Sequence, residues 1–180
     1  MNWLQQMDWQ LLYWLQNTVV CDTLDVIMPI ITALGDGGFI WILAGILLLC
    51  TKKYRRYGLI LLIGLGIGAL LGNLCLKPLF ARPRPCWLET GIPLLIANPT
   101  DYSFPSGHTL AACIGATILT LTNGKFGFGA IPLACLIAFS RLYLFVHFPS
   151  DVMGGAILGI GIGCFSYFIL PKIWRRKQQE

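Results

Sequence analysis

The chain has 180 residues, of which 56% are hydrophobic and only 12% are charged, and its formal net charge is +5. A soluble domain carries about 25% charged residues, so this composition excludes an ordinary soluble protein and indicates one embedded in a lipid bilayer. The positive charge does not indicate nucleic acid as a partner, because it lies beside apolar runs and no recognition motif accompanies it.

Residues 1–23 are predicted to form an N-terminal amphipathic helix that lies in the membrane interface. Apolar side chains recur here at helical spacing, whereas polar side chains occupy the other faces. The apolar set is Leu4, Met7, Leu11, Leu12, Leu15 and Val19, and the polar set is Gln5, Gln6, Asp8, Gln16 and Asn17. The alternative is a sixth membrane span.

Five later segments are long and apolar enough to cross a membrane, since a helix of about 20 residues spans roughly 30 Å of hydrocarbon. They cover about residues 24–50, 57–77, 107–123, 127–146 and 151–171. The predicted fold class is therefore all-α, an integral membrane helical bundle over residues 24–171, followed by a basic cytoplasmic tail at 172–180.

Basic residues indicate the orientation of this bundle, because cytoplasmic connections carry an excess of Lys and Arg. Nine of the thirteen fall on one predicted side: Lys52, Lys53, Arg55, Arg56, Lys125, Lys172, Arg175, Arg176 and Lys177. The other four, Lys77, Arg82, Arg84 and Arg141, fall opposite. We therefore predict a multi-pass protein of the bacterial cell membrane with its N-terminus outside and its C-terminus inside.

Seven cysteines show no spacing typical of metal ligands, so we expect neither a metal site nor a cofactor. Cys21 and Cys86 are the two that fall outside the apolar segments. Whether they form a disulfide stays open.

Three polar clusters lie on the predicted outer side. The first runs from Lys77 through Arg82 and Arg84 to Pro85, the second is Pro105-Ser106-Gly107-His108, and the third comprises Ser140, Arg141, His147 and Asp151. All of them lie at the ends of predicted spans, so the extracytoplasmic face is the predicted place of an active site.

Phosphate is the ligand that the cations and the second cluster favour. Lys77, Arg84 and Arg141 would be costly near a membrane without an anion, and guanidinium groups match phosphate oxygens in bidentate geometry. Ser106 is a predicted N-cap of the third span, whose free backbone N–H groups add anion donors. Gly107 allows a phosphate to approach the backbone closely.

The two histidines, which are the only ones in the chain, supply reactivity. Asp151 is four residues after His147 and is predicted to hold one ring nitrogen, leaving the other free to attack phosphorus. His108 is the predicted general acid that protonates the leaving oxygen.

The patterns K-x6-R-P, P-S-G-H and S-R-x5-H-x3-D resemble the three signature motifs of the type 2 phosphatidic acid phosphatase superfamily, over roughly residues 24–171. The resemblance implies a metal-independent lipid phosphatase in which His147 is the nucleophile that becomes phosphohistidine, Asp151 its partner and His108 the acid. It implies that Lys77, Arg84, Arg141, Ser106 and Gly107 bind phosphate. Arg82 is outside the motif and receives only a supporting role. The soluble vanadium haloperoxidases of the same superfamily are excluded by the predicted spans.

The expected partners are therefore membrane lipids and a lipid phosphate substrate. Undecaprenyl diphosphate fits the predicted outer face best, and phosphatidylglycerol phosphate or phosphatidic acid is the alternative. A non-catalytic lipid-binding or transport protein is the alternative of another class. Against it, phosphate binding alone needs neither a nucleophile nor its partner.

Two rows of glycines at four-residue spacing lead to a packing hypothesis. They are Gly64, Gly68 and Gly72 on the second span and Gly155, Gly159 and Gly163 on the fifth. Small-residue rows let helices approach closely, so we expect these two spans to pack against each other along them. The alternative is that the glycines face lipid or a second copy of the chain.

Overall fold

The computed structural model describes the backbone of residues 3–176 and the side chains up to residue 171. The helices are α1 (Trp3–Thr18), α2 (Asp22–Leu34), α3 (Phe39–Cys50), α4 (Arg55–Gly68), α5 (Lys77–Phe80), α6 (Pro85–Leu88), α7 (Gly107–Thr122), α8 (Gly124–Tyr143) and α9 (Pro149–Arg176). A 3-10 turn η1 (Asp36–Gly38) joins α2 to α3, and a π-helix η2 (Ala69–Leu76) joins α4 to α5. No strand occurs among residues 3–176, which confirms the all-α prediction.

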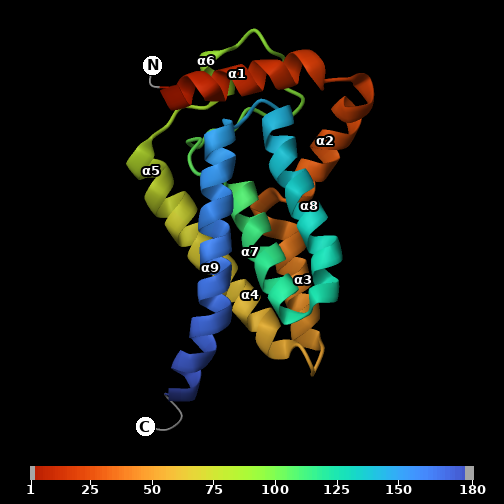
Figure 1. Ribbon diagram of the computed structural model, residues 1–180, viewed down its shortest axis with the longest axis vertical. Coiled ribbons are helices and arrows are strands. Elements are labelled where there is room, and N and C mark those ends of the chain that lie inside the picture. Colours follow the sequence, from red (N-terminus) through yellow and green to blue (C-terminus); the bar gives the residue numbers. More distant parts are fainter. Residues whose placement is uncertain (1–2, 177–180) are drawn as a thin grey trace.

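The long helices form a bundle around α7, and α1 lies across one end of it (Figure 1). Helix α7 packs against α4, α8 and α9, and its residues Leu110, Ile114 and Ile118 are fully buried in the main core. A second, smaller core lies under α1 and joins Leu12 and Leu15 to the segment from Tyr143 to Phe148. The protein therefore has a membrane-type bundle with a separately packed end.

Three helical stretches are long and apolar enough to cross a membrane: Arg55–Leu88, Gly124–Tyr143 and Pro149–Pro171. A fourth is gained if α2 and α3, which are bent by 44° at their junction, count as one span. Helix α7 is apolar but has only 16 residues. The protein is thus a multi-pass membrane protein, whereas these helices do not establish the predicted count of five spans.

The first predicted span, 24–50, is broken in its middle. Gly37 and Gly38 adopt φ angles of +58° and +75°, which ends α2 and starts α3 in a new direction, because only glycine enters this region without strain. The hydropathy pattern did not reveal this break, because the residues on both sides of it are apolar. Asp36, an acidic residue in the middle of the segment, was the signal for it.

The apolar residues of the N-terminal helix are divided between the bundle and the outside. Asp8 is buried together with Leu12 and Leu15, whereas Met7 and Leu11 are half exposed. An ion pair, described below, compensates the buried carboxylate. The exposed apolar residues of α1 remain available to lipid, and α1 is not among the helices that could cross a membrane by themselves.

The packing hypothesis for the two glycine rows is wrong for most of these glycines, because they face α7. Helices α4 and α9 do contact each other, and a Cβ atom at Gly64 would lie 3.1 Å from Oγ of Ser166 in α9. A Cβ atom at Gly68 or Gly72 would lie 2.5 Å or 2.4 Å from Ile114 or Leu110 of α7. One at Gly159 would lie 2.6 Å from the carbonyl oxygen of Leu110. Each row therefore lets one long helix approach the central helix, on different sides.

The predicted basic tail, 172–180, begins inside α9, which extends to Arg176. Its remaining residues, 177–180, lie outside the described residues. Cys21 and Cys86 are both free thiols.

Two glycines of α9 provide a matched test of the close approach to α7. Gly159→Ala should lower the free energy of unfolding by roughly 1–3 kcal/mol, because its methyl group meets fixed backbone atoms. Gly161→Ala, with nothing within 4 Å of its Cβ position, should be neutral or stabilising by up to about 1 kcal/mol. Thermal unfolding in detergent measures both, and equal effects would contradict this packing.

Candidate active site

The eight residues predicted for the site gather at the end of the bundle that α1 covers. Lys77 and Arg84 come from α5 and the start of α6, and Arg141 from the last turn of α8. Ser106, Gly107 and His108 start α7, whereas His147 and Asp151 come from the α8–α9 connection and the first turn of α9. Lys77, Arg84, Arg141, His147 and Asp151 are all buried.

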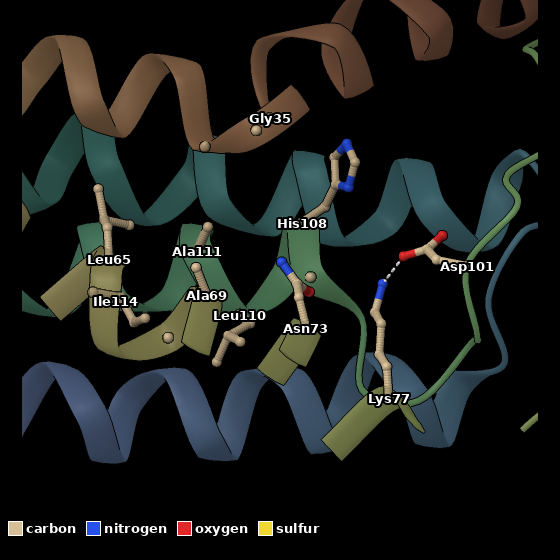
Figure 2. A pocket seen from close by; sticks show the side chains of 14 residues that line it. Gly35, Leu65, Ala69, Asn73, Lys77, Asp101, His108, Leu110, Ala111 and Ile114 are labelled. Carbon is tan, nitrogen blue, oxygen red and sulfur yellow. Dashed lines mark hydrogen bonds and ion pairs between the residues drawn. The ribbon is translucent and has the colours of Figure 1, made fainter. Parts of the chain in front are cut away.

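Lys77 and Arg84 share one carboxylate, that of Asp101 (Figure 2 shows the Lys77 contact). Asp101 accepts a hydrogen bond from Lys77 Nζ through Oδ2 and one of 2.6 Å from Arg84 Nη2 through Oδ1. Burial alone would raise the pKa of Asp101, but Lys77 and Arg84 outweigh it and lower this pKa from 3.8 to about 2. Asp101 is therefore an ionised anion held by two of the predicted phosphate ligands.

Arg141 is a buried cation without an anion. Its Nη1 donates to the hydroxyl of Thr32, and its Nε has no hydrogen-bond partner among the described residues. No carboxylate of residues 3–171 lies within ion-pair distance of it. A buried guanidinium in this condition is strongly unfavourable unless a ligand supplies the missing charge.

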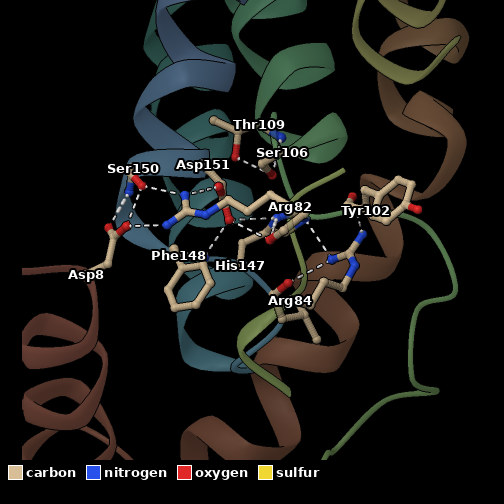
Figure 3. Close-up of polar contacts among 12 residues, drawn as sticks. Asp8, Arg82, Arg84, Tyr102, Ser106, Thr109, His147, Phe148, Ser150 and Asp151 are labelled. Carbon is tan, nitrogen blue, oxygen red and sulfur yellow. Dashed lines mark hydrogen bonds and ion pairs between the residues drawn. The ribbon is translucent and has the colours of Figure 1, made fainter. Parts of the chain in front are cut away.

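His147 is held with one ring nitrogen directed at the cations (Figure 3). Its Nε2 lies 3.0 Å from Arg84 Nη1, and since a guanidinium only donates, Nε2 is the unprotonated nitrogen and its lone pair accepts from Arg84. The ring proton is then on Nδ1. Burial, and then the charges of Arg84, Arg141 and Lys77, hold the pKa of His147 well below 6.5, so the ring is neutral at pH 7.

Ser103 lies between the ring and its predicted partner, Asp151. The distance from Nδ1 of His147 to Oδ2 of Asp151 is 3.7 Å, too long for a hydrogen bond. The Ser103 hydroxyl is 3.3 Å from Nδ1 and donates to Oδ2 at 2.5 Å. The carboxylate therefore orients the ring largely through a serine that no sequence motif indicated.

Arg82 connects the site to the N-terminal helix. Its Nη1 donates to Asp151 Oδ1 at 2.5 Å, and its Nη2 donates to Asp8 Oδ2 at 2.6 Å (Figure 3). Asp8 also accepts from the backbone N–H of Ser150 at 2.9 Å. This chain of contacts fixes the second oxygen of Asp151, so Arg82 has a larger structural role than its place outside the motif suggested.

The residues at the start of α7 divide between capping and the pocket. Ser106 is the N-cap, as predicted, and its hydroxyl accepts from the backbone N–H of Thr109. His108 Nε2 lies 2.8 Å from Asp36 Oδ1, and its ring packs where a Cβ at Gly35 would be 2.9 Å away. The break between α2 and α3 therefore supplies both the room and a carboxylate for His108.

An open pocket of about 210 Å³ leads to this site, and Lys77, Asp101, Gly107 and His108 line it (Figure 2). Arg84, Arg141 and His147 are not among its lining residues. Because Asp101 bonds to Lys77 in the pocket and to buried Arg84, which contacts His147, it lies between the pocket and His147. Within the described residues, no group of three or more His, Cys, Asp or Glu side chains is arranged to hold a metal ion.

Four acidic or hydroxyl residues of the site were missed from the sequence: Asp8, Asp36, Asp101 and Ser103. Asp8 and Asp36 carried a weak signal, because each is an acidic residue within an apolar helical pattern. Asp101 and Ser103 had none. They belong to the connection after α6, whose Ile92, Leu94 and Ile96 pack on the second core.

The contact between α1 and the site should contribute to stability. Asp8→Ala leaves Arg82 with one carboxylate fewer, and we expect the free energy of unfolding to fall by roughly 1–3 kcal/mol. Gln6→Ala, on the exposed side of the same helix, should change it by less than about 0.5 kcal/mol. Thermal unfolding of both variants in one detergent compares them, and an unchanged Asp8→Ala protein would show that the pair is not stabilising.

Comparison with known proteins places the chain in a family. The family model for the PAP2 superfamily matches residues 53–175. The undecaprenyl-diphosphatase of Sulfolobus acidocaldarius is 40% identical over 130 residues, which cover 71% of this chain and 62% of that protein. The undecaprenyl-diphosphatase BcrC of Bacillus subtilis is 33% identical over 153 residues, covering 84% and 77%. Phosphatidylglycerophosphatase B of the same organism is 35% identical over 152 residues, covering 76% and 70%.

Two solved structures share the fold over nearly the whole chain. A transmembrane PAP2-type phosphatidylglycerolphosphate phosphatase from Bacillus subtilis aligns with a TM-score of 0.76 at 27% identity, covering 98% of this chain and 88% of that one. LpxE of Aquifex aeolicus aligns with a TM-score of 0.76 at 30% identity, covering 89% and 94%. The chain spans less than two thirds of the length of the Sulfolobus relative, 77% of BcrC and 70% of phosphatidylglycerophosphatase B. On the family match and these relatives, which are phosphatases by name, the chain belongs to the PAP2 superfamily.

Proposed function

We propose that this protein is a membrane lipid phosphatase that transfers the phosphoryl group of its substrate to His147 and then to water. The charge of the site carries this proposal. Lys77, Arg84 and Arg141 have a single carboxylate, Asp101, within ion-pair distance among the described residues, so three buried positive charges face one negative charge and a net charge of +2 remains. A phosphate monoester brings about 1.5–2 negative charges at pH 7 and matches this deficit.

In the first chemical step, Arg84 Nη1 transfers its hydrogen bond from His147 Nε2 to the bound phosphate, and the released lone pair of Nε2 attacks phosphorus. A bond from nitrogen to phosphorus forms while the bond from phosphorus to the leaving oxygen breaks, and His108 gives that oxygen a proton. Burial and the charge of Arg141 lower the pKa of His108 to about 4, and the negative charge of the bound phosphate favours the protonated ring that this step requires. Lys77, Arg84 and Arg141 neutralise the charge on the transferred group. The ring becomes positively charged, and the contact of Nδ1 through Ser103 to Asp151 stabilises it.

In the second step, water attacks the phosphohistidine. His108, now neutral, takes a proton from the water, and the bond between phosphorus and Nε2 breaks to release inorganic phosphate. Asp36 lies beside His108 Nε2 and would hold the ring in place for both proton transfers. A protein that only binds or transports lipid phosphates would not need this arrangement of nucleophile, relay and acid.

Undecaprenyl diphosphate is the substrate that we favour. Two relatives with this activity in their names are 40% and 33% identical to this chain. Phosphatidylglycerol phosphate is the second candidate, since phosphatidylglycerophosphatase B is 35% identical and one of the similar structures is such an enzyme. Both substrates place a phosphate at the end of an apolar chain.

The site would face the outside of a bacterial cell membrane. It lies at the end of the bundle away from the basic connection between α3 and α4, which carries Lys52 and Lys53. The exposed native cysteines Cys21, at the site end, and Cys50, at the other, test this. In variants that retain only one of them, a membrane-impermeant maleimide should label Cys21 but not Cys50 in intact cells. The reverse would place the site in the cytoplasm.

The activity test uses the purified protein with EDTA and each of the two lipid substrates. We expect phosphate release to persist, and His147→Ala to lower its rate on the order of 10³-fold or more because the nucleophile is lost. Rapid acid-free quenching with labelled substrate should trap phosphohistidine in the wild-type protein. Release that survives in His147→Ala would exclude this mechanism.

The lowered pKa of His147 predicts how the rate depends on pH. Burial and neighbouring cations disfavour the protonated ring, so the nucleophile stays neutral well below pH 6.5. We therefore expect kcat/KM, corrected for ionisation of the substrate, to show no enzyme group titrating near 6.5. Two substrates with different phosphate pKa values separate the two titrations, and an acid limb at 6.5 common to both would contradict the geometry.

A further inference from the structure

The lining of the pocket beside Lys77 changes from polar to apolar along one face of the helical stretch Arg55–Leu88, which comprises α4, η2, α5 and α6. Leu65, Ala69, Asn73 and Lys77 follow at four-residue intervals on α4, η2 and α5, and all line the pocket. On the opposite wall, α7 presents His108, then Ala111, then Ile114 (Figure 2). A lipid phosphate fits this order in one direction only, with its terminal phosphate at Lys77 and its chain toward Leu65.

Asn73 is the polar group between these two ends. Its amide has no hydrogen-bond partner among the described residues, although it lies inside the long apolar stretch Arg55–Leu88. Its Oδ1 is 3.0 Å from the position of a Cβ at Gly107, so the amide reaches the start of α7. Asn73 is exposed and lines the pocket, so its amide is free to donate to and accept from a ligand that enters there.

The π-helix η2 is what gives Asn73 this place. Residues 69–76 are wound more loosely than an α-helix, and such segments are frequent at functional sites. Asn73 lies about one turn from Lys77, roughly 5 Å along the axis, on the side of the apolar wall. A diphosphate whose terminal phosphate lies at Lys77 would therefore place its second phosphate near Asn73.

We infer that Asn73 binds the leaving group of the substrate, donating its amide N–H to an oxygen of the second phosphate of a prenyl diphosphate. The inference rests on the proposed function and adds a specificity-determining residue to it. A neutral amide suits this position, because it stabilises the departing phosphate without drawing the transferred phosphoryl away from the cations. The departing phosphate then remains on the prenyl chain as its monophosphate.

The experiment compares substrates that differ in the leaving group. Undecaprenyl diphosphate has a phosphate there, phosphatidylglycerol phosphate has a glycerol oxygen, and p-nitrophenyl phosphate has an aryl oxygen with no further acceptor nearby. The variants are Asn73→Ala and Asn73→Asp. Leu74→Ala is the control, because Leu74 is in the same π-helix, is 70% exposed and does not line the pocket.

For Asn73→Ala, we expect kcat/KM to fall about tenfold or more for undecaprenyl diphosphate and to stay within twofold for p-nitrophenyl phosphate. Asn73→Asp should be worse for the diphosphate, because its carboxylate repels the departing phosphate, and less harmful for the glycerol substrate. Leu74→Ala should behave as wild type. Equal losses on all three substrates, or none on the diphosphate, would overturn the inference while leaving the phosphatase proposal intact. If the wild-type protein releases phosphate from no substrate, the proposed function falls and this inference with it.

Discussion

Lys77, Arg84 and Arg141 place three positive charges in a part of the protein where water does not reach them freely, and an isolated buried charge costs several kcal/mol. Neighbouring elements compensate only part of this charge. The connection after α6 brings Asp101 to two of the cations, while Arg141 keeps an unpaired Nε. An anion that enters the site neutralises the remaining positive charge. The free-energy cost of burying that charge in the ligand-free protein therefore favours binding.

The second consequence of this charge is the control of His147. Burial and the cations keep its ring neutral, and Arg84 Nη1 donates to Nε2 and so holds that nitrogen beside the cations. Ser103 and Asp151 hold the opposite nitrogen, and Arg82 and Asp8 hold Asp151 in turn. Helix α1 thus contributes a buried carboxylate to the support of His147, while Met7 and Leu11 on the same helix stay half exposed. Helix α1 therefore helps to hold the geometry of the site through the contacts of Asp8 with Arg82 and Ser150.

Sequence reasoning could place the residues whose position follows from helix ends. Lys77, His108 and Arg141 each stand at a helix terminus, so predicting the spans brought them to one end of the bundle. It could not place Asp101 or Ser103, because their path depends on how an irregular connection packs on a second core. Residues 24–50 were predicted as one span because most of them are apolar. The hydropathy pattern does not show that Gly37 and Gly38 adopt left-handed conformations and break the helix. The sequence showed the two glycine rows but not the helix that they contact. Their spacing indicates that another helix approaches closely, and it does not indicate which helix that is.

Binding of inorganic phosphate to the wild-type protein and to Asp101→Asn tests the central claim most directly. Phosphate should raise the thermal unfolding temperature far more than chloride at equal ionic strength, because it pairs with the unpaired cations. Asp101→Asn should bind phosphate more tightly than the wild type, since the competing carboxylate is gone, and Arg141→Met should bind it much more weakly. If phosphate and chloride act alike, or if Asp101→Asn gains no affinity, the buried cations are not a phosphate site and this account is wrong.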